Sequence, residues 1–512
     1  MAIRKVATMG NINMEQVGKM SRTAAAEDDR NLLKYYVETG TFREMCDGGQ
    51  IVLGSKGSGK TALFEHACAH LQGQGIQTVK FSLMSNFPLE RQKMFQDDNV
   101  SDVERYVLGW QYTLYLAAYL TLKKNGFLRV WQKGAFLRIW DKGVFLSLWQ
   151  NFMLRRRYRL ARRHDAGGIL EKWLRAELDM SVKVKGIAFT LRRSHNPIQR
   201  NDDMRKFVDA MNEAALRTKY VILIDGIDPI WDNKKNESDR IPIIQGLLQA
   251  VRKINRECRE YALLRPELDD SGADDLASLS SLARVICFLR DDIFGELSYS
   301  DRNKVSSGAI SLSWSQEKLQ EVVMSRVRYL CQADDVSWED LVDNSVKMVR
   351  QQLPSTYLWK HTFNRPRDFI VYVASAAKVS NDHGRSRICK TDIEAACGLY
   401  CEHVLKEFED EYSSGQYDFE VIKRAFREIG ENRFSWSRWE ACDVFETESI
   451  AERYLFHAID RSLIGWKRTG GKGGGSSWQY VCFGGISPND RNLDFIIHPA
   501  MQKGLQIKES RK

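Results

Sequence analysis

The sequence predicts an α/β fold, in which a three-layer core built on a parallel sheet is followed by a helical lid and a C-terminal winged helix. Two features predict the core. A glycine-rich segment at residues 54–61 lies between a short apolar run and a helical pattern, and an apolar run at residues 220–224 ends in acidic residues. Apolar runs that alternate with helical patterns are typical of parallel strands covered by helices on both faces.

The glycine-rich segment reads Gly-Ser-Lys-Gly-Ser-Gly-Lys-Thr. Its glycines allow successive backbone N–H groups to converge on phosphate oxygens, and the start of the following helix adds partial positive charge there. We therefore expect it to bind a nucleoside triphosphate, with Lys60 at the β- and γ-phosphates and the Thr61 hydroxyl at Mg²⁺. The predicted nucleotide-binding residues of this segment are Gly54, Ser55, Lys56, Gly57, Ser58, Gly59, Lys60 and Thr61.

The second apolar run has the pattern of a strand buried on both faces, and Asp225 follows it directly. An Asp at the carboxyl end of such a strand lies beside the phosphate-binding loop, so we predict that Asp225 holds Mg²⁺ through water. Asp228 is the nearest acid that could orient or deprotonate the attacking water. Many hydrolytic proteins of this kind place a Glu directly after the Mg²⁺-binding Asp, but this chain has Gly226 there. The predicted enzyme is therefore a slow ATPase.

Three more strands complete the predicted sheet, at residues 77–83, 284–289 and 309–314. Arg290 follows the second of these at the carboxyl end of the sheet. We predict that it contacts the γ-phosphate, and a surface Arg held in an ion pair is the alternative.

Helical patterns dominate residues 315–412. Ser315 is predicted to cap the first helix, residues 338–353 to form the second, with Pro354 as its stop, and Pro366 to lie in the first turn of the third. This region is interpreted as a lid, and Arg365 and Arg367 at the start of its third helix are the candidates that reach back to the bound phosphates.

The last hundred residues contain three short helical patterns, at 419–429, 435–445 and 448–463. Two short runs at 464–468 and 478–483 follow, separated by a glycine-rich stretch. Three helices and a hairpin predict a winged helix, which binds either DNA or protein partners. The acids on its third helix leave both alternatives open.

Composition places the chain among large proteins with substantial cores: it has 512 residues, of which 43% are hydrophobic. The absence of any run of about 18 apolar residues argues against a membrane-spanning helix, and ten scattered cysteines indicate a cytoplasmic location. Cys397 and Cys401 lie one turn apart but have no second spaced pair, so core thiols are a better interpretation than metal ligands. The net charge of +9 permits a nucleic-acid surface without requiring one.

Four regions are therefore predicted. These are an N-terminal helical segment at 1–48, the ATPase core at 49–314 with a helical insertion at about 90–215, the lid at 315–412, and the winged helix at 413–512.

The insertion contains a nine-residue repeat over residues 127–149, followed by an arginine-rich stretch from Arg155 to Arg163. One interpretation is an arm that binds a partner, oligomerises or contacts nucleic acid; the other is a local duplication within a helical subdomain. We favour the duplication for the tryptophans of the repeat and an acidic partner for the arginines.

Four motifs in order carry a family resemblance: GSKGSGKT at 54–61, YVILIDGID at 220–228, VICFLRDDIF at 285–294 and NRPRDFIVYV at 364–373. With the winged helix, they resemble bacterial P-loop ATPases of the STAND and origin-recognition-like AAA+ group, and most closely a stand-alone subgroup with FLRxDIF and RPRDFI motifs. The resemblance covers roughly residues 25–500.

The resemblance implies an Mg-ATP-dependent conformational switch in which Lys60, Thr61, Asp225, Arg290 and Arg367 take the roles given above. Such proteins are often found in anti-phage systems, so it suggests a defence role exerted through a partner or effector, and a homo-oligomer. The alternatives are an origin-recognition-like DNA-binding module with structural nucleotide and an oligomerising scaffold.

Overall fold

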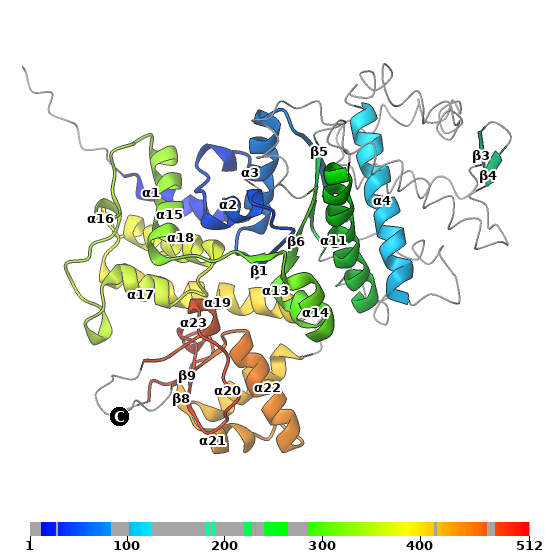
Figure 1. Ribbon diagram of the computed structural model, residues 1–512. Helices are drawn as coiled ribbons and strands as arrows, with labels where there is room; N and C mark the ends of the chain where they lie inside the picture. The colour runs from blue at the N-terminus through cyan, green and yellow to red at the C-terminus, as the bar shows by residue number, and fades with distance from the viewer. Residues whose placement is uncertain are drawn as a thin grey trace, which may run out of the picture. The chain divides into compact units, whose positions relative to one another are not determined.

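The computed structural model spans the 512-residue chain (Figure 1). The residues that it describes are 12–26, 29–82, 102–124, 181–184, 187–190, 220–227, 231, 240–264, 284–297, 299–413, 417–467 and 477–510. They form two compact units. The first contains the residues up to Glu38, the segment Lys56–Gly59 and the chain from Ser313 onwards; the second contains Thr39–Ser55 and Lys60–Leu312.

The second unit is built on a five-stranded sheet in the order β2-β5-β6-β1-β7, and every neighbouring pair is parallel. The strands are β1 (Ile51–Gly54), β2 (Gln77–Ser82), β5 (Tyr220–Asp225), β6 (Val285–Arg290) and β7 (Ala309–Ser311). The predicted parallel α/β core is therefore confirmed. β7 is shorter than predicted, because only Ala309–Ser311 pair with β1 as a strand.

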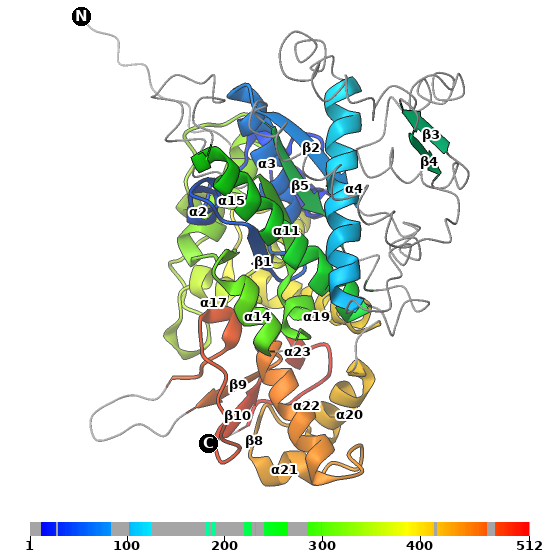
Figure 2. The same ribbon diagram turned by 45° about the vertical axis from the view of Figure 1, so that its right-hand side comes forward.

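Helices cover both faces of this sheet, as the side-chain alternation along its strands requires. On one face, Phe288 of β6 packs edge-to-face on Phe64 of α3 (Lys60–Gly73), with ring centroids 5.6 Å apart. On the other face, Leu53 and Ile224 join a buried cluster with α4 (Asp102–Lys124) and α11 (Arg240–Leu264). These two helices lie side by side (Figure 2). The core thus has the three layers that the sequence predicts.

The shorter elements of this unit are α2 (Gly40–Cys46), α13 (Asp291–Gly295), α14 (Tyr299–Ser306) and the antiparallel pair β3 (Ser181–Val184) and β4 (Ile187–Thr190). α4, β3 and β4 fall within the predicted helical insertion. α4 packs on the sheet through Trp110, whose ring lies 6.5 Å from the Phe81 ring of β2 between centroids. The Trp110 indole also donates to the Ile243 carbonyl of α11 at 3.0 Å. The nine-residue repeat and the stretch Arg155–Arg163 lie outside the described residues.

The first unit begins with α1 (Met14–Gly18), η1 (Lys19–Thr23) and η3 (Leu32–Lys34). Met14, Val17 and Met20 join a buried cluster with α15 (Gln316–Cys331) and α18 (Pro366–Asp382). A buried ion pair, Arg326 Nη1 to Asp29 Oδ2 at 3.1 Å, also joins this segment to α15. α2 belongs to the other unit, so residues 1–48 are not a single body.

Helices follow β7, as predicted for the lid. The Ser315 hydroxyl caps α15 by accepting from the Lys318 N–H at 3.3 Å, and Pro366 lies in the first turn of α18. α18 packs on α19 (Lys390–Tyr412) through stacked Tyr372 and Tyr400 rings, 4.5 Å apart.

The predicted helix at 338–353 is wrong. α16 spans only Trp338–Leu341, a single 3-10 turn, η8, follows at Val349–Gln351, and Pro354 begins α17 (Pro354–Lys360). The Asp343 carboxylate accepts from the Ser345 N–H at 2.9 Å, which stabilises a turn directly after α16. A proline is tolerated at the first helical position because that N–H has no partner within the helix.

The C-terminal part of the unit contains α20 (Phe419–Ile429), α21 (Trp436–Glu440), α22 (Glu448–Asp460) and α23 (Pro499–Gln502). An antiparallel sheet in the order β8-β10-β9 accompanies them, formed by β8 (Arg433–Phe434), β10 (Asp494–Ile497) and β9 (Ile464–Lys467). α20 has the predicted bounds. The first three of these helices lie where the sequence predicts three short helical patterns.

The predicted second hairpin strand at 478–483 is wrong. Only Gln479 bridges to β9, the chain then forms a 3-10 turn, η9 (Val481–Phe483), and β9 pairs fully with β10. Gly484, with φ of +86°, and a bond from the Gly485 N–H to the Tyr480 carbonyl at 2.9 Å turn the chain away from the sheet. Among the described residues, none of the helices has the length and apolarity needed to cross a membrane.

Candidate nucleotide-binding site

The phosphate loop (Gly54–Thr61) follows β1 and runs into α3. We call Gly54, Ser55, Lys60 and Thr61 its base. Gly54 is the last residue of β1, and Lys60 is the first of α3. Lys60 Nζ donates to the carbonyl oxygens of Gly54, at 2.8 Å, and Ser55, at 2.9 Å. The ammonium is therefore held over the loop's own backbone, where Lys60 is predicted to meet phosphates.

The loop tip (Lys56–Gly59) requires glycine at two positions. Gly57 and Gly59 have φ of +79° and +97°, in the left-handed region that favours glycine. A Cβ on Gly57 would also come within 3.2 Å of the Arg367 Cβ. Between them, Ser58 is only 3% exposed, and its hydroxyl has no hydrogen-bond partner among the described residues. A buried hydroxyl in a glycine-shaped turn fits a loop built to receive an anion.

The first turn of α18 is bonded to the loop tip. The Arg367 N–H donates to the Gly57 carbonyl at 3.3 Å, so the loop satisfies a helix-start donor that has no partner within the helix. Arg367 Nη1 contacts Glu407 Oε2 of α19 at 3.3 Å, and Lys56 Nζ lies 3.9 Å from the same oxygen. Arg367 Nε is buried and has no hydrogen-bond partner among the described residues. Arg367 thus lies beside the loop tip.

Arg365 has different surroundings, although it is only two residues away. Its guanidinium is buried and donates to Glu411 Oε1 at 2.9 Å, and Arg461 contacts the other oxygen of that carboxylate. The Arg365 cation also lies over the rings of Phe363 and Phe408, 5.4 and 5.3 Å from their centroids. The structure therefore places Arg365 in a buried ion-pair network.

The carboxyl ends of the sheet carry the other predicted residues. β6 lies between β1 and β5 in the sheet. Arg290, at the end of β6, is in register with Gly54 at the end of β1, and Asp225 is the last residue of β5. Arg290 is 4% exposed, and its Nε and Nη2 contact Asp292 at 3.0 and 2.5 Å. Arg290 is thus held in an ion pair with Asp292, but it is buried and does not lie at the surface.

Thr61 and Asp225 are both half-buried, at the start of α3 and the end of β5. Burial raises the pKa of the Cys68 thiol on α3 to about 12, with smaller contributions from the neighbouring carboxylates of Glu65 and Asp225. A hydroxyl and a carboxylate at these two chain positions suit Mg²⁺, which prefers oxygen ligands. Asp228, the predicted water-orienting acid, lies outside the described residues.

A chain of hydrogen bonds leads from the loop tip to the C-terminal part of the same unit. The Trp314 indole donates to the Ser58 carbonyl at 2.8 Å. The Asn364 amide in turn donates to the carbonyls of Trp314, at 2.8 Å, and Cys482, at 3.0 Å, and accepts from the Trp359 indole at 2.9 Å. Asn364 has φ of +56°, a conformation that is uncommon for a residue with a side chain. Sequence reasoning missed this residue, although it directly precedes Arg365 and Pro366.

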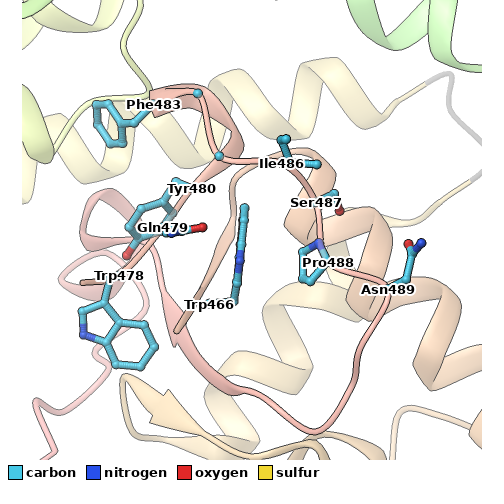
Figure 3. A pocket seen from close by; sticks show the side chains of 11 residues that line it. Trp466, Trp478, Gln479, Tyr480, Phe483, Ile486, Ser487, Pro488 and Asn489 are labelled. Atoms are coloured by element: carbon cyan, nitrogen blue, oxygen red, sulfur yellow. The ribbon is translucent and has the colours of Figure 1, made fainter. Parts of the chain in front are cut away.

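The chain of bonds ends beside an aromatic cavity of about 720 Å³. Figure 3 shows Trp466, Trp478, Tyr480 and Phe483 around it, closed on one side by residues 484–489. The sequence predicts a strand over residues 478–483, so this cavity is not predicted from sequence. Three aromatic residues within six, followed by Gly-Gly-Ile-Ser-Pro, were the available signal.

Two cations flank this cavity. Arg433 and Lys467 each lie 5.8 Å from the centroid of the Trp478 ring, within the range of cation–π attraction. The cavity therefore combines apolar walls with a positively charged margin.

Cys397 and Cys401, which are interpreted from sequence as core thiols in preference to metal ligands, are both buried on α19. Their Sγ atoms lie 3.9 Å apart. Within the part of the chain that the structure describes, no three His, Cys, Asp or Glu side chains group as metal ligands.

Residues 317–409 match the family described as the FunZ-associated C-terminal helical domain, a segment that lies within the predicted lid. Among curated protein sequences, none is significantly similar to this chain.

Three solved structures show low similarity. The ORC2 protein of Aeropyrum pernix, in ADPNP–ADP complexes, is 10% identical, with a TM-score of 0.35 over 94% of this chain and 97% of that one. Cdc6p from Pyrobaculum aerophilum is 10% identical, with a TM-score of 0.25 over 93% and 98%. Drosophila ORC bound to DNA is 10% identical, with a TM-score of 0.26 over 99% and 94%. At these TM-scores the similarity supports no conclusion about function.

Proposed function

We propose that this chain is an Mg-ATP-binding switch that hydrolyses ATP slowly and controls a partner. The loop tip carries the proposal. Ser58 Oγ and Arg367 Nε are buried beside glycines in left-handed conformation, and neither has a hydrogen-bond partner among the described residues. Leaving buried donors unpaired costs about 1–3 kcal/mol each. Phosphate oxygens would supply the missing acceptors.

The roles within the site follow from residue chemistry. Lys60 and the backbone N–H groups of the phosphate loop would bind phosphates, and Arg367 would contact them from the first turn of α18. Thr61 and Asp225 would hold Mg²⁺, which neutralises phosphate charge when bound. Arg290 and Arg365 join the site only if their ion pairs with Asp292 and Glu411 open.

The proposed output is the C-terminal part of the unit that contains the loop tip. The bonds from Ser58 through Trp314 and Asn364 to Cys482 support this, because a phosphate that moved the loop tip would strain them. The proposed partner is either an effector protein that acts in antiviral defence or a nucleic acid. The candidate sites are residues 413–512, which are predicted to form a winged helix, and the stretch Arg155–Arg163. Oligomerisation through the insertion is part of the same proposal.

The central test removes the Lys60 charge. Lys60→Ala should weaken ATP binding about 100-fold, since a hydrogen bond to a charged group contributes roughly 1.5–3 kcal/mol. Titration with a fluorescent ATP analogue measures the affinity, and Lys347→Ala, at an exposed position, is the matched control. Equal affinity in the Lys60 variant and the wild type would refute the proposal.

A second test separates binding from hydrolysis. Asp228→Asn should keep wild-type ATP affinity and reduce phosphate release about 100-fold, if its carboxylate orients or deprotonates the attacking water. Asp335→Asn, at an exposed position after α15, controls for the lost charge. Normal turnover in the Asp228 variant would show that another acid performs this step.

A further inference from the structure

Two cations from different elements converge on one carboxylate at the loop tip. Lys56 Nζ of the phosphate loop lies 3.9 Å from Glu407 Oε2, and Arg367 Nη1 of α18 lies 3.3 Å from it. The side chains of Lys56, Arg367 and Glu407 are 28%, 20% and 23% exposed, so water reaches all three. These contacts are weak enough to break and are close enough to hold the cations.

The carboxylate neutralises charge that a phosphate would otherwise meet. Lys56 and Arg367 together carry two positive charges, and Glu407 reduces their sum to one. A carboxylate and a phosphate make the same kind of charge-assisted hydrogen bonds to a guanidinium. A phosphate that binds at the loop tip must therefore compete with Glu407 for its donors.

We propose that Glu407 is an internal competitor for the anion site of the phosphate loop. It pairs with Lys56 and Arg367 while no phosphate is bound, and it is displaced when nucleotide phosphate takes those donors. Glu407 thereby lowers nucleotide affinity and makes α19 move relative to the loop tip on binding. This inference rests on the proposed function, because it assigns a regulator to the same site.

The competing explanation is a structural salt bridge that fixes α19 to α18 at all times. A structural pair would hold the loop tip in its binding conformation, so its loss would weaken nucleotide binding or leave it unchanged. An internal competitor predicts the opposite sign. The direction of the affinity change therefore separates the two explanations.

The experiment measures the affinity of a fluorescent ATP analogue for Glu407→Gln, with Glu402→Gln as the control. Glu402 is exposed on the same helix, so the control changes the net charge of α19 equally. Glu407→Gln should bind about 3- to 10-fold more tightly, the range expected for releasing one or two partly exposed ion pairs. Glu402→Gln should bind like the wild type.

A double-mutant cycle tests the mechanism. In an Arg367→Gln background, Glu407→Gln should give less than half of its usual gain, measured as the logarithm of affinity, because the principal donor is already absent. An undiminished gain would mean that Glu407 acts elsewhere and would overturn the proposal. If Glu407→Gln fails to fold, Glu407→Asp, which draws the carboxylate back by one methylene, should still raise the affinity, and no gain there would overturn it equally.

The wild type separates this inference from the proposed function. Should neither the wild type nor any variant bind ATP, both fail. Should the wild type bind ATP through Lys60 while Glu407→Gln binds no more tightly, the inference alone fails and the ATP switch stands.

Discussion

The base and the tip of the phosphate loop differ in what fixes them. Lys60, at the base, is bonded to the carbonyls of Gly54 and Ser55, six and five residues away. The tip is bonded to Trp314, 256 residues from Ser58, and to Arg367 of α18. The base is thus determined locally, while the tip depends on contacts with the helical region. In the proposed switch, the tip would therefore link phosphate binding to the helical region.

Two neighbouring arginines give the largest expected contrast. Arg365→Gln should lower the free energy of unfolding by about 3 kcal/mol, because it breaks a buried ion pair with Glu411. Arg367→Gln should change stability by less than about 1 kcal/mol, since its pair with Glu407 is partly exposed, but should weaken ATP binding roughly tenfold. Thermal unfolding and nucleotide titration of both variants measure the contrast. If Arg365→Gln lost affinity and Arg367→Gln lost stability, the assignment of the two roles would be reversed.

Much of the fold, and the position of the phosphate loop, could be predicted from sequence, because their determinants are local. The motif at 54–61, the buried strand patterns and the Ser315 cap each depend on residues within a few positions of one another. The same holds for α20, whose bounds Phe419–Ile429 agree with the prediction.

The contacts of the tip with the helical region could not be predicted in the same way. Glu407 lies 40 residues from Arg367, and no local pattern distinguishes it from Glu402 or Glu409 on the same helix. Local patterns also gave the wrong result at Pro354, which fits a helix start as well as a stop, and at Trp478–Phe483, where Gly484 ends the extended run. In each case the deciding contact was a turn or a distant partner.

A middle-sized effect is expected at Asn364, which joins the tip to the C-terminal part. Asn364→Ala removes three hydrogen bonds and places Ala at a φ of +56°, so it should cost about 2 kcal/mol of stability. ATP affinity should stay within twofold of the wild type, because Lys60 is untouched. Hydrogen exchange over residues 478–487 should respond to ATP in the wild type and lose that response in the variant.

Asn364→Gly is the matched control for the backbone. Gly accepts the positive φ but lacks the amide, so it should also lose the ATP response while costing less stability. An intact response in both variants would show that the tip communicates with the C-terminal part by another route, or does not communicate.

The smallest expected effect is the pH dependence of stability in the unit that contains the loop tip. His498 is fully buried, its Nδ1 accepts from the Ala500 N–H at 3.2 Å, and its ring stacks on Phe363. Burial, with smaller contributions from the charges of His361 and Arg365, lowers the pKa of His498 well below its usual 6.5. The unfolded chain therefore binds a proton below pH 6.5 that the folded chain does not, and stability falls as pH falls through that value.

At pH 5.5 this one group should cost roughly 1 kcal/mol relative to pH 7.5. His498→Asn keeps an acceptor for the Ala500 N–H but cannot be protonated, so its melting temperature should fall less than that of the wild type over the same pH range. The difference between the two slopes is the measurement, because other groups titrate equally in both proteins. Parallel slopes of melting temperature against pH would mean that His498 is already protonated in the folded protein. Acid would then not destabilise the unit that contains the loop tip through this residue.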